Sequence, residues 1–218
     1  MTRKERFKKI IDYFKVNMPA AETELDYKTP YELIVATILS AQCTDKRVNM
    51  LTPAFFRKFP TPKHLANAEV TEIFDLIRSC SYPNSKANHL SGMAKMLVND
   101  FGGIVPSDIN QLQKLPGVGR KTANVVASVA YNKPALAVDT HVFRVAKRLG
   151  LSYNAKTPLE TEKQLVAHIP EELIPIAHHW LILHGRYVCI ARKPKCLECG
   201  VKEFCKEYIL KIRKQTDL

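Results

Sequence analysis

Residues 115–121 read Leu-Pro-Gly-Val-Gly-Arg-Lys and lie between two stretches with helical periodicity. Pro116 ends the first helix, and Gly117 and Gly119 permit a tight reversal that lets a foreign backbone come close. A helix that starts at Arg120 directs unpaired N–H groups and the positive end of its dipole outward, which is typical of a phosphate site. A plain turn between two helices would use similar residue types. Two cations at a helix start oppose the dipole, however, so they indicate a bound anion or a chemical task.

Helical patterns extend over nearly the whole chain of 218 residues, which is 46% hydrophobic and contains only 8 glycines. Thr29-Pro30-Tyr31-Glu32 has the pattern of a capping box with proline at the first helical position, and Thr157-Pro158-Leu159-Glu160 repeats it. Alternating, strand-like segments are hard to find. The tail from Arg186 is loop-like, with short turns around its cysteines. The sequence therefore predicts an all-α protein, with helices over residues 3–16, 30–41, 46–58, 62–67, 71–79, 85–100, 108–114, 120–131, 140–149, 158–168 and 171–184.

The charge balance favours a polyanionic partner. Lys and Arg number 33 against 21 Asp and Glu, a formal net charge of +12, and nucleic acid is the commonest partner of such proteins, although solubility alone also explains a basic balance. No apolar run approaches the roughly 18 residues that span a bilayer. The N-terminal segment is amphipathic and lacks the apolar core of an export signal. We expect no membrane association and a cytoplasmic location.

Four of the six cysteines crowd into the end of the chain, with the spacing Cys189-x6-Cys196-x2-Cys199-x5-Cys205. In a reducing compartment this crowding indicates metal ligation rather than disulfides. Structural zinc usually uses two close cysteine pairs, and this tail has one. A [4Fe–4S] cluster is larger than one ion and tolerates wider spacing. The spacing alone leaves both metals open.

Other residues that suggest chemistry have a simpler interpretation. Cys43 and Cys80 lie in apolar helical surroundings and are expected to be buried, inert thiols. His178 and His179 precede His184 by six and five residues, whereas helical ligand pairs prefer spacings of three or four. We expect these histidines to lie in the core or to form hydrogen bonds.

The hairpin resembles the helix-hairpin-helix DNA-binding motif, and LPGVGRKTANVV (115–126) is very similar to that stretch of the endonuclease III family. The similarity extends over nearly the whole chain, through LSAQCTD (39–45), NSKA (84–87), AVDTHVFRV (137–145), HHWLILHGR (178–186) and the cysteine tail. The family comprises bifunctional DNA glycosylases and abasic-site lyases of base excision repair that remove oxidised pyrimidines. The resemblance implies a monomer that acts on double-stranded DNA with damaged pyrimidines or abasic sites, associated with the nucleoid in a bacterium.

The resemblance also implies two helical domains with a DNA-binding cleft between them. A six-helix domain of residues 23–133 would carry the helix-hairpin-helix. Residues 1–22 and 134–218 would form the second domain and hold a [4Fe–4S] cluster in the loop 189–205. Its ligands would be Cys189, Cys196, Cys199 and Cys205.

By the same resemblance, Lys121 is the amine nucleophile and Asp139 the carboxylate that stabilises charge or assists proton transfer. A flipped nucleotide exposes its sugar C1′, which a neutral amine can attack to expel the base and leave a Schiff base. β-Elimination then breaks the strand. A helix from Arg120 to Tyr131 rises roughly 16 Å, and the eight steps back to Asp139 reach about 26 Å. The chain can therefore bring the two side chains together.

The amine must be neutral, although free lysine titrates near pH 10.4, so deprotonation at neutral pH costs roughly 4 kcal/mol. A helix N-terminus supplies at most about 1 kcal/mol. Burial, or cations such as Arg120, would have to supply the rest. Without the resemblance, an Asp139 that merely caps the helix 140–149 would be the ordinary interpretation.

The DNA contacts implied by the resemblance come from three places. The hairpin contributes Leu115, Gly117, Val118, Gly119 and Arg120. Gln42 would fill the gap left by the flipped nucleotide. Tyr82 precedes NSKA, next to the family's leucine wedge position, and could stack on a base, although Pro83 reshapes this loop.

Three alternatives stay open from the sequence. A monofunctional glycosylase, like the related adenine glycosylases, would lack the lysine. A non-enzymatic helix-hairpin-helix module would bind duplex DNA but leave abasic sites intact. An iron–sulfur electron carrier would have little use for the basic charge and the phosphate hairpin.

Overall fold

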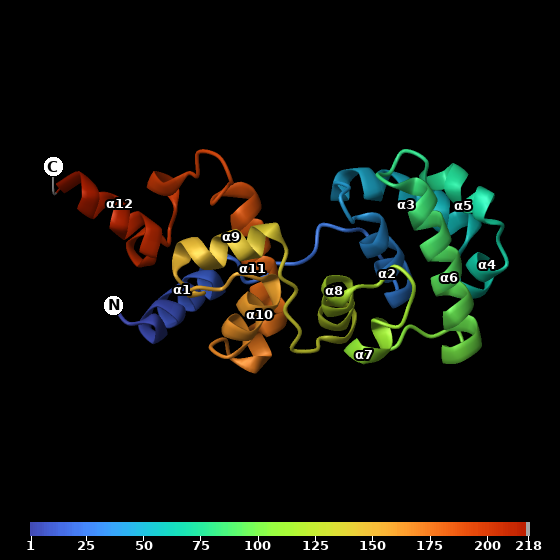
Figure 1. Ribbon diagram of the computed structural model, residues 1–218, viewed down its shortest axis with the longest axis horizontal. Coiled ribbons are helices and arrows are strands. Elements are labelled where there is room, and N and C mark those ends of the chain that lie inside the picture. The colour runs from blue at the N-terminus through green and yellow to red at the C-terminus, as the bar shows by residue number, and fades with distance from the viewer. Residues whose placement is uncertain (217–218) are drawn as a thin grey trace. The chain divides into compact units, whose positions relative to one another are not determined.

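A computed structural model describes residues 1–216, and for residues 213–216 it describes the backbone alone. Within the described residues every regular element is a helix, as the sequence predicted. The chain divides into two compact units, a terminal unit of Met1–Glu22 and Pro134–Leu218 and a central unit of Thr23–Lys133. The central unit is thus inserted into the sequence of the terminal unit (Figure 1).

The central unit is built around α2 (Pro30–Leu39), which is buried on nearly all sides. An α-helix that is apolar all round belongs in a core, and α2 contacts α3, α6 and α8. The long helix α6 in turn packs against α4 and α5. The other helices of this unit are α3 (Asp45–Lys58), α4 (Pro62–Ala66), α5 (Val70–Ile77), α6 (Pro83–Phe101), α7 (Ile109–Leu112) and α8 (Arg120–Tyr131).

The terminal unit joins the two ends of the sequence in one core. Helix α1 (Arg3–Asn17) packs its buried Phe7, Ile10 and Phe14 against residues from the C-terminal half, and Figure 1 shows it beside that half. Trp180 stacks on Phe14 and donates its indole N–H to the carbonyl of Met18 at 2.8 Å. The remaining elements are α9 (Thr140–Leu149), α10 (Pro158–Val166), α11 (Ile174–Tyr187), α12 (Lys206–Thr216) and the 3-10 turns Glu171–Leu173, Cys196–Glu198 and Lys202–Phe204.

The two predicted capping boxes form only in part. Thr29 and Thr157 each cap their helix by accepting the N–H of the glutamate three residues later. The carboxylates of Glu32 and Glu160, however, accept the N–H of the residue before the cap. In each of these helices the threonine therefore satisfies one orphan N–H group, that of the glutamate.

The prediction of a loop-like tail from Arg186 is wrong at two places. Helix α11 continues to Tyr187, and residues 206–216 form α12. Lys211 and Glu207 form an i, i+4 ion pair at 2.9 Å, which supports this helix. The cysteine segment between the two helices has the predicted short turns.

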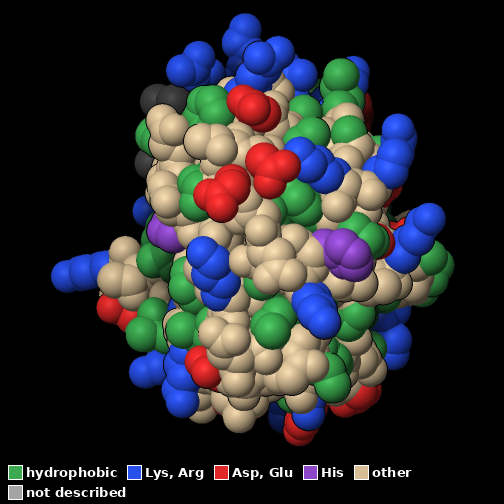
Figure 2. Space-filling view, turned by 90° about the vertical axis from the view of Figure 1, so that its right-hand side faces the viewer, with side chains coloured by type: hydrophobic (Ala, Val, Ile, Leu, Met, Phe, Trp, Pro, Cys, Tyr) green, Lys and Arg blue, Asp and Glu red, His purple; other side chains and the backbone are tan. Residues whose placement is uncertain are grey.

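The face turned toward the viewer in Figure 2, on the side of α4, α5 and α6, mixes both signs of charge. Lys58 and Glu72 of this unit pair at 2.9 Å. Such a mixture is typical of a solvated surface. Among the described residues, no helix has both the length and the apolarity needed to cross a membrane.

Candidate functional site

The hairpin between α7 and α8 has a buried apolar side and an exposed backbone side. Leu115 and Val118 are 2% and 5% exposed, so their side chains anchor the turn in the core of the central unit. The Val118 N–H donates to the Leu115 carbonyl at 3.0 Å. Gly117 has φ +78°, and a Cβ there would lie 2.8 Å from the Cβ of His89. A side chain at this position is therefore excluded both by conformation and by space.

Helix α8 begins without a side-chain cap. Its N-cap, Gly119, is exposed and has no side chain to accept the first N–H groups, and the first turn carries no acidic residue. Seven other described helices begin at a Thr or Asp whose side chain accepts such an N–H. The turn at Gly119 thus presents donors and a positive dipole end to an incoming anion.

Lys121 and Asp139 lie in different units, each at the start of a helix. The Lys121 side chain is exposed in the first turn of α8. Asp139 is the N-cap of α9, where its Oδ1 accepts the Val142 N–H at 2.8 Å. The capping role considered from the sequence is therefore real, and Asp139 is held in one orientation by it. Of the two sources of a neutral amine that the sequence argument named, burial and neighbouring cations, burial is absent at Lys121 in the described structure.

Gln42 and Tyr82 are brought together by two neighbouring loops of the central unit. Both are non-glycine residues with left-handed backbones, at φ 54° and φ 56°. The Ser81 hydroxyl donates to the Gln42 carbonyl at 2.6 Å and joins the loops. Tyr82 is 64% exposed, and Gln42 is exposed as well. Strained backbone of this kind costs roughly 1–3 kcal/mol and is often found at functional sites.

Lys86 is a component of these loops that the sequence analysis missed. Its side chain is 4% exposed, and its ammonium donates to the carbonyls of Leu39 and Ala41 at 2.7 and 2.8 Å. It thereby closes the C-terminal end of α2 and fixes the chain that leads to Gln42. Burial lowers the pKa of the Lys86 ammonium, while the nearby Cys80 and Cys43 thiols act in the opposite direction. The helical period of α6 places Lys86 on the same face as the buried apolar residues, and this pattern could have indicated a buried lysine.

The four tail cysteines gather around one small cavity of the terminal unit. Cys189, Cys196, Cys199 and Cys205 all line it, together with Leu149, His184, Val188 and Tyr208. Burial raises the pKa of the Cys199 and Cys205 thiols; the other three cysteines add to the rise at Cys199, and Cys189 adds to it at Cys205. No three His, Cys, Asp or Glu side chains in the described part of the chain are grouped to hold a single metal ion. Four soft thiol donors around a cavity fit an iron–sulfur cluster.

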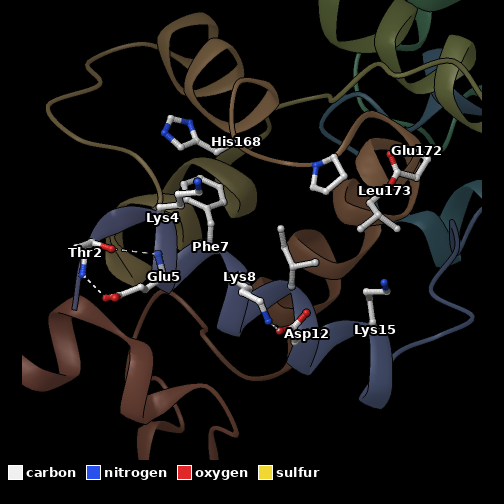
Figure 3. Close-up of a pocket in the computed structure, with 12 residues that line it drawn as sticks. Thr2, Lys4, Glu5, Phe7, Lys8, Asp12, Lys15, His168, Glu172 and Leu173 are labelled. Carbon is white, nitrogen blue, oxygen red and sulfur yellow. Dashed lines mark hydrogen bonds and ion pairs between the residues drawn. The ribbon is translucent and has the colours of Figure 1, made fainter.

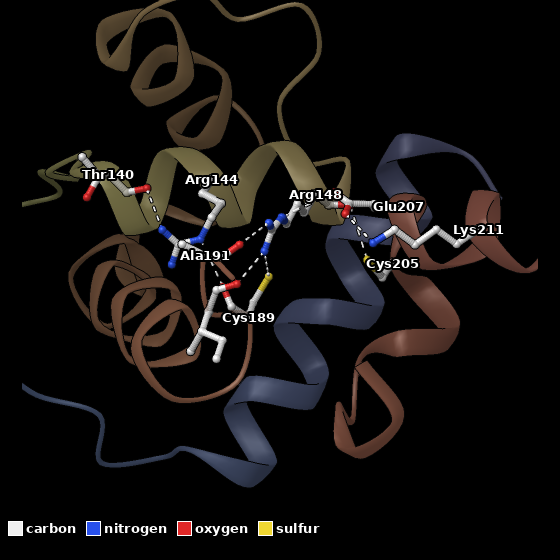
Figure 4. Close-up of polar contacts among 9 residues, drawn as sticks. Thr140, Arg144, Arg148, Cys189, Ala191, Cys205, Glu207 and Lys211 are labelled. Carbon is white, nitrogen blue, oxygen red and sulfur yellow. Dashed lines mark hydrogen bonds and ion pairs between the residues drawn. The ribbon is translucent and has the colours of Figure 1, made fainter. Parts of the chain in front are cut away.

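Two arginines of α9 hold the cysteine segment in place (Figure 4). Arg144 donates to the carbonyls of Gly185 and Cys189 at 2.8 and 3.1 Å. Arg148 donates to the carbonyls of Ile190 and Ala191 at 2.8 and 3.1 Å and lies 3.6 Å from the Cys189 sulfur. Nearby, Gly200 allows the ring of Tyr13 to approach so closely that a Cβ would overlap it. The guanidinium groups of Arg144 and Arg148 therefore support the cysteine segment from α9.

The terminal unit has a second, wider cavity, which lies between α1 and the segment that follows α10 (Figure 3). Phe7 and Leu173 supply apolar walls, and Lys8 pairs with Asp12 at its edge at 2.8 Å. No sequence-predicted site residue lines it.

Of the histidines of α11, His178 and His184 are buried, as the sequence predicted, and His179 is partly buried. His178 is buried, with its Nδ1 3.0 Å from the carbonyl oxygen of Ala137. Burial lowers the pKa of His179 and of His184 to about 4.

The fold, the hairpin and the cysteine cavity together define a DNA repair protein with an iron–sulfur cluster. Residues 35–171 match the HhH-GPD superfamily of base excision DNA repair proteins, and residues 189–205 match the iron-sulfur binding domain of endonuclease III. The chain belongs to the endonuclease III family. This confirms two predictions from the sequence, the bifunctional DNA glycosylase and lyase activity and the [4Fe–4S] cofactor.

Individual relatives agree over nearly the full length. Endonuclease III of Rickettsia felis is 46% identical over 92% of this chain and 93% of its own. Endonuclease III of Bacillus subtilis is 47% identical over 87% and 86%. A solved structure of a trapped endonuclease III–DNA covalent intermediate matches with a TM-score of 0.91 and 43% identity, covering 98% of this chain and 100% of the other.

Proposed function

We propose that this enzyme flips and excises oxidised pyrimidines and cleaves the strand 3′ to abasic sites, with Lys121 as the nucleophile and Asp139 as the carboxylate. It acts as a monomer on double-stranded DNA, in the cytoplasm beside the nucleoid. The observation that carries this proposal is the exposed Lys121 in the first turn of a helix that begins at an uncapped glycine. A phosphate bound at that turn would place the adjacent sugar within reach of the amine.

In the proposed reaction the Lys121 nitrogen forms a bond to C1′, and the base leaves with the electron pair of the glycosidic bond. Ring opening gives a Schiff base, and loss of a C2′ proton expels the 3′ phosphate. Because Lys121 is exposed in the free protein, bound DNA would supply the desolvation that a neutral amine needs. Asp139 would stabilise the developing positive charge on the sugar.

The DNA contacts divide by type. The backbone at Gly117 and Gly119 and the side chain of Arg120 would bind phosphate, while Leu115 and Val118, being buried, would contribute only through their backbone. Gln42 and Tyr82 lie on adjacent loops. Gln42 would fill the gap left by the flipped nucleotide, and Tyr82 would act as the wedge that stacks on a base.

We also infer that Cys189, Cys196, Cys199 and Cys205 ligate the [4Fe–4S] cluster, because all four line one cavity. When bound, the cluster supplies four metal–thiolate bonds that cross-link the segment 189–205. Arg144 and Arg148 hold this segment against α9. The four cysteines and the two arginines therefore stabilise the structure and take no part in the chemical steps.

Borohydride trapping tests the nucleophile. Wild-type protein should form a covalent adduct with an abasic duplex, and Lys121→Ala should form none while still binding that duplex. Lys133→Ala is the matched control, because Lys133 is exposed beyond the other end of the same helix. An adduct that persists in Lys121→Ala would remove Lys121 from the mechanism.

Asp139→Asn separates chemistry from stability. Asparagine caps helices about as well as aspartate, so α9 should keep its start, while base excision should fall by about 10²-fold or more. Asp108→Asn, at the N-cap of α7, is the matched control. Equal excision rates in the two variants would contradict the role of Asp139.

A further inference from the structure

Cys43 and Cys80 place two thiols side by side in the central unit, outside the cluster site. Cys43 lies between α2 and α3, Cys80 lies between α5 and α6, and their sulfur atoms are 3.9 Å apart. Both are free thiols. We propose that this pair is a reversible disulfide site that forms by exchange with a low-molecular-weight disulfide such as glutathione disulfide.

The surrounding contacts keep the two thiols in register. Ser81, next to Cys80, donates to the carbonyl of Gln42, next to Cys43, at 2.6 Å. Lys86 fixes the end of α2 on the other side. A disulfide bond is about 2.05 Å long, so the two sulfur atoms must approach each other by about 2 Å, on loops that are already joined by a hydrogen bond.

The two thiols differ in access, which sets the order of the exchange. Cys43 is partly exposed and can meet a small disulfide, whereas Cys80 is 5% exposed. Burial raises the pKa of the Cys80 thiol to about 11, and Cys43 adds to the rise, while Lys86 and Arg47 act in the opposite direction. Cys43 is therefore the first to react and Cys80 the one that resolves.

The exchange is balanced without further reagents. The Cys43 thiolate attacks one sulfur of glutathione disulfide, forms a mixed disulfide and releases one glutathione thiolate. Cys80 then loses its proton and attacks the Cys43 sulfur, forming the protein disulfide and releasing the second glutathione. Two protein thiols are oxidised, and one glutathione disulfide is reduced to two glutathione molecules.

The consequence for DNA follows from the neighbours of the pair and rests on the proposed function of Gln42 and Tyr82. A disulfide between Cys43 and Cys80 cross-links the two loops and so restricts the positions that the Gln42 and Tyr82 side chains can take. Binding constellations tolerate displacements of only about 0.5 Å. The oxidised protein should therefore bind an abasic duplex at least about five-fold more weakly, equal to about 1 kcal/mol.

Peptide mapping tests whether the bond forms. The holoprotein is treated with glutathione disulfide, free thiols are alkylated, and trypsin then releases residues 29–46 and 79–86, each with one cysteine of the pair. The expected product is these two peptides joined and lighter by two hydrogens, with separation by dithiothreitol. Cys43→Ser and Cys80→Ala should each abolish the product. Recovery of both peptides unlinked, while visible absorbance shows an intact cluster, would overturn the proposal.

Binding measurements test the consequence and separate it from the proposed function. Reduced wild type should bind the abasic duplex, oxidised wild type more weakly, and dithiothreitol should restore binding, whereas Cys43→Ser should not respond to oxidation. A reduced protein that does not bind the duplex would defeat the proposed function but leave the linked peptide as a finding. Oxidised wild type that is fully linked and binds as well as reduced protein would defeat the regulatory consequence alone.

Discussion

Replacing Lys86 by methionine should destabilise the central unit strongly, although methionine has a similar length and no charge. Lys86 is 4% exposed and donates two hydrogen bonds, to the carbonyls of Leu39 and Ala41. Methionine leaves both acceptors without the ammonium and leaves the C-terminal end of α2 without a cation.

The expected magnitude follows from these contacts. A hydrogen bond to a charged group contributes about 1.5–3 kcal/mol, so two contribute about 3–6 kcal/mol. Part of this is recovered, because the variant no longer buries an ammonium, and the lowered pKa of Lys86 shows that this burial has a cost. We expect a net loss of about 2–4 kcal/mol in the free energy of unfolding, or about 1 M in the urea midpoint.

Urea unfolding followed by far-ultraviolet circular dichroism measures the effect. Lys95→Met is the matched control, because Lys95 is an exposed lysine on the same helix, α6. Its free energy of unfolding should stay within about 0.5 kcal/mol of the wild-type value. If the two variants unfold at the same urea concentration, the hydrogen bonds from Lys86 to the carbonyls of Leu39 and Ala41 do not stabilise the central unit as argued.

Three further perturbations test other parts of the structure. Gly117→Ala should lower the free energy of unfolding by about 1–3 kcal/mol, because φ is +78° and the new Cβ would meet His89; a variant as stable as wild type would contradict the steric argument. Gly119→Ala has open space around the new Cβ and φ −83°, so it should unfold like wild type yet bind DNA more weakly in an anisotropy titration. Arg148→Met should speed cluster loss to a chelator by about tenfold, about 1.4 kcal/mol, because the hydrogen bonds to Ile190 and Ala191 disappear, and an unchanged rate of bleaching would argue against this support. The pKa of His179 is about 4 in the folded protein against 6.5 ordinarily, so its contribution to stability is complete above pH 6.5 and is lost as the pH falls toward 4. Wild type therefore loses unfolding free energy between pH 7 and 4.5, and His179→Gln should lose about 2–3 kcal/mol less. The same pH dependence for both proteins in urea titrations would refute this.

Local rules were sufficient to predict the elements that end at special backbone positions. The helices at residues 120–131 and 140–149 were predicted with the bounds that the structure shows. Their ends are set by Asn132 and Gly150, which adopt left-handed conformations at φ 51° and φ 79°. The hairpin, likewise, depends on residues that are adjacent in the sequence.

Features that depend on distant partners could not be predicted in this way. The helical period of α6 places Lys86 on the buried face, but its hydrogen-bond acceptors, the carbonyls of Leu39 and Ala41, lie more than forty positions away and could not be identified from the sequence. The contact between Cys43 and Cys80 likewise joins positions 37 residues apart. Helix α12 was missed for a different reason. The loop predicted around the cysteines was extended beyond Cys205 and so included a segment that is helical.

The split of the terminal unit between the two ends of the chain has a consequence for biosynthesis. Helix α1 leaves the ribosome before the surfaces that cover Phe7, Ile10 and Phe14, because these belong to residues translated after position 133. The central unit can complete its own core during translation, whereas the apolar stripe of the nascent α1 stays without its partners until residues after position 133 emerge. The basic residues of the N-terminal segment, at positions 3, 4, 6, 8 and 9, help to keep this helix soluble before its partners are synthesised.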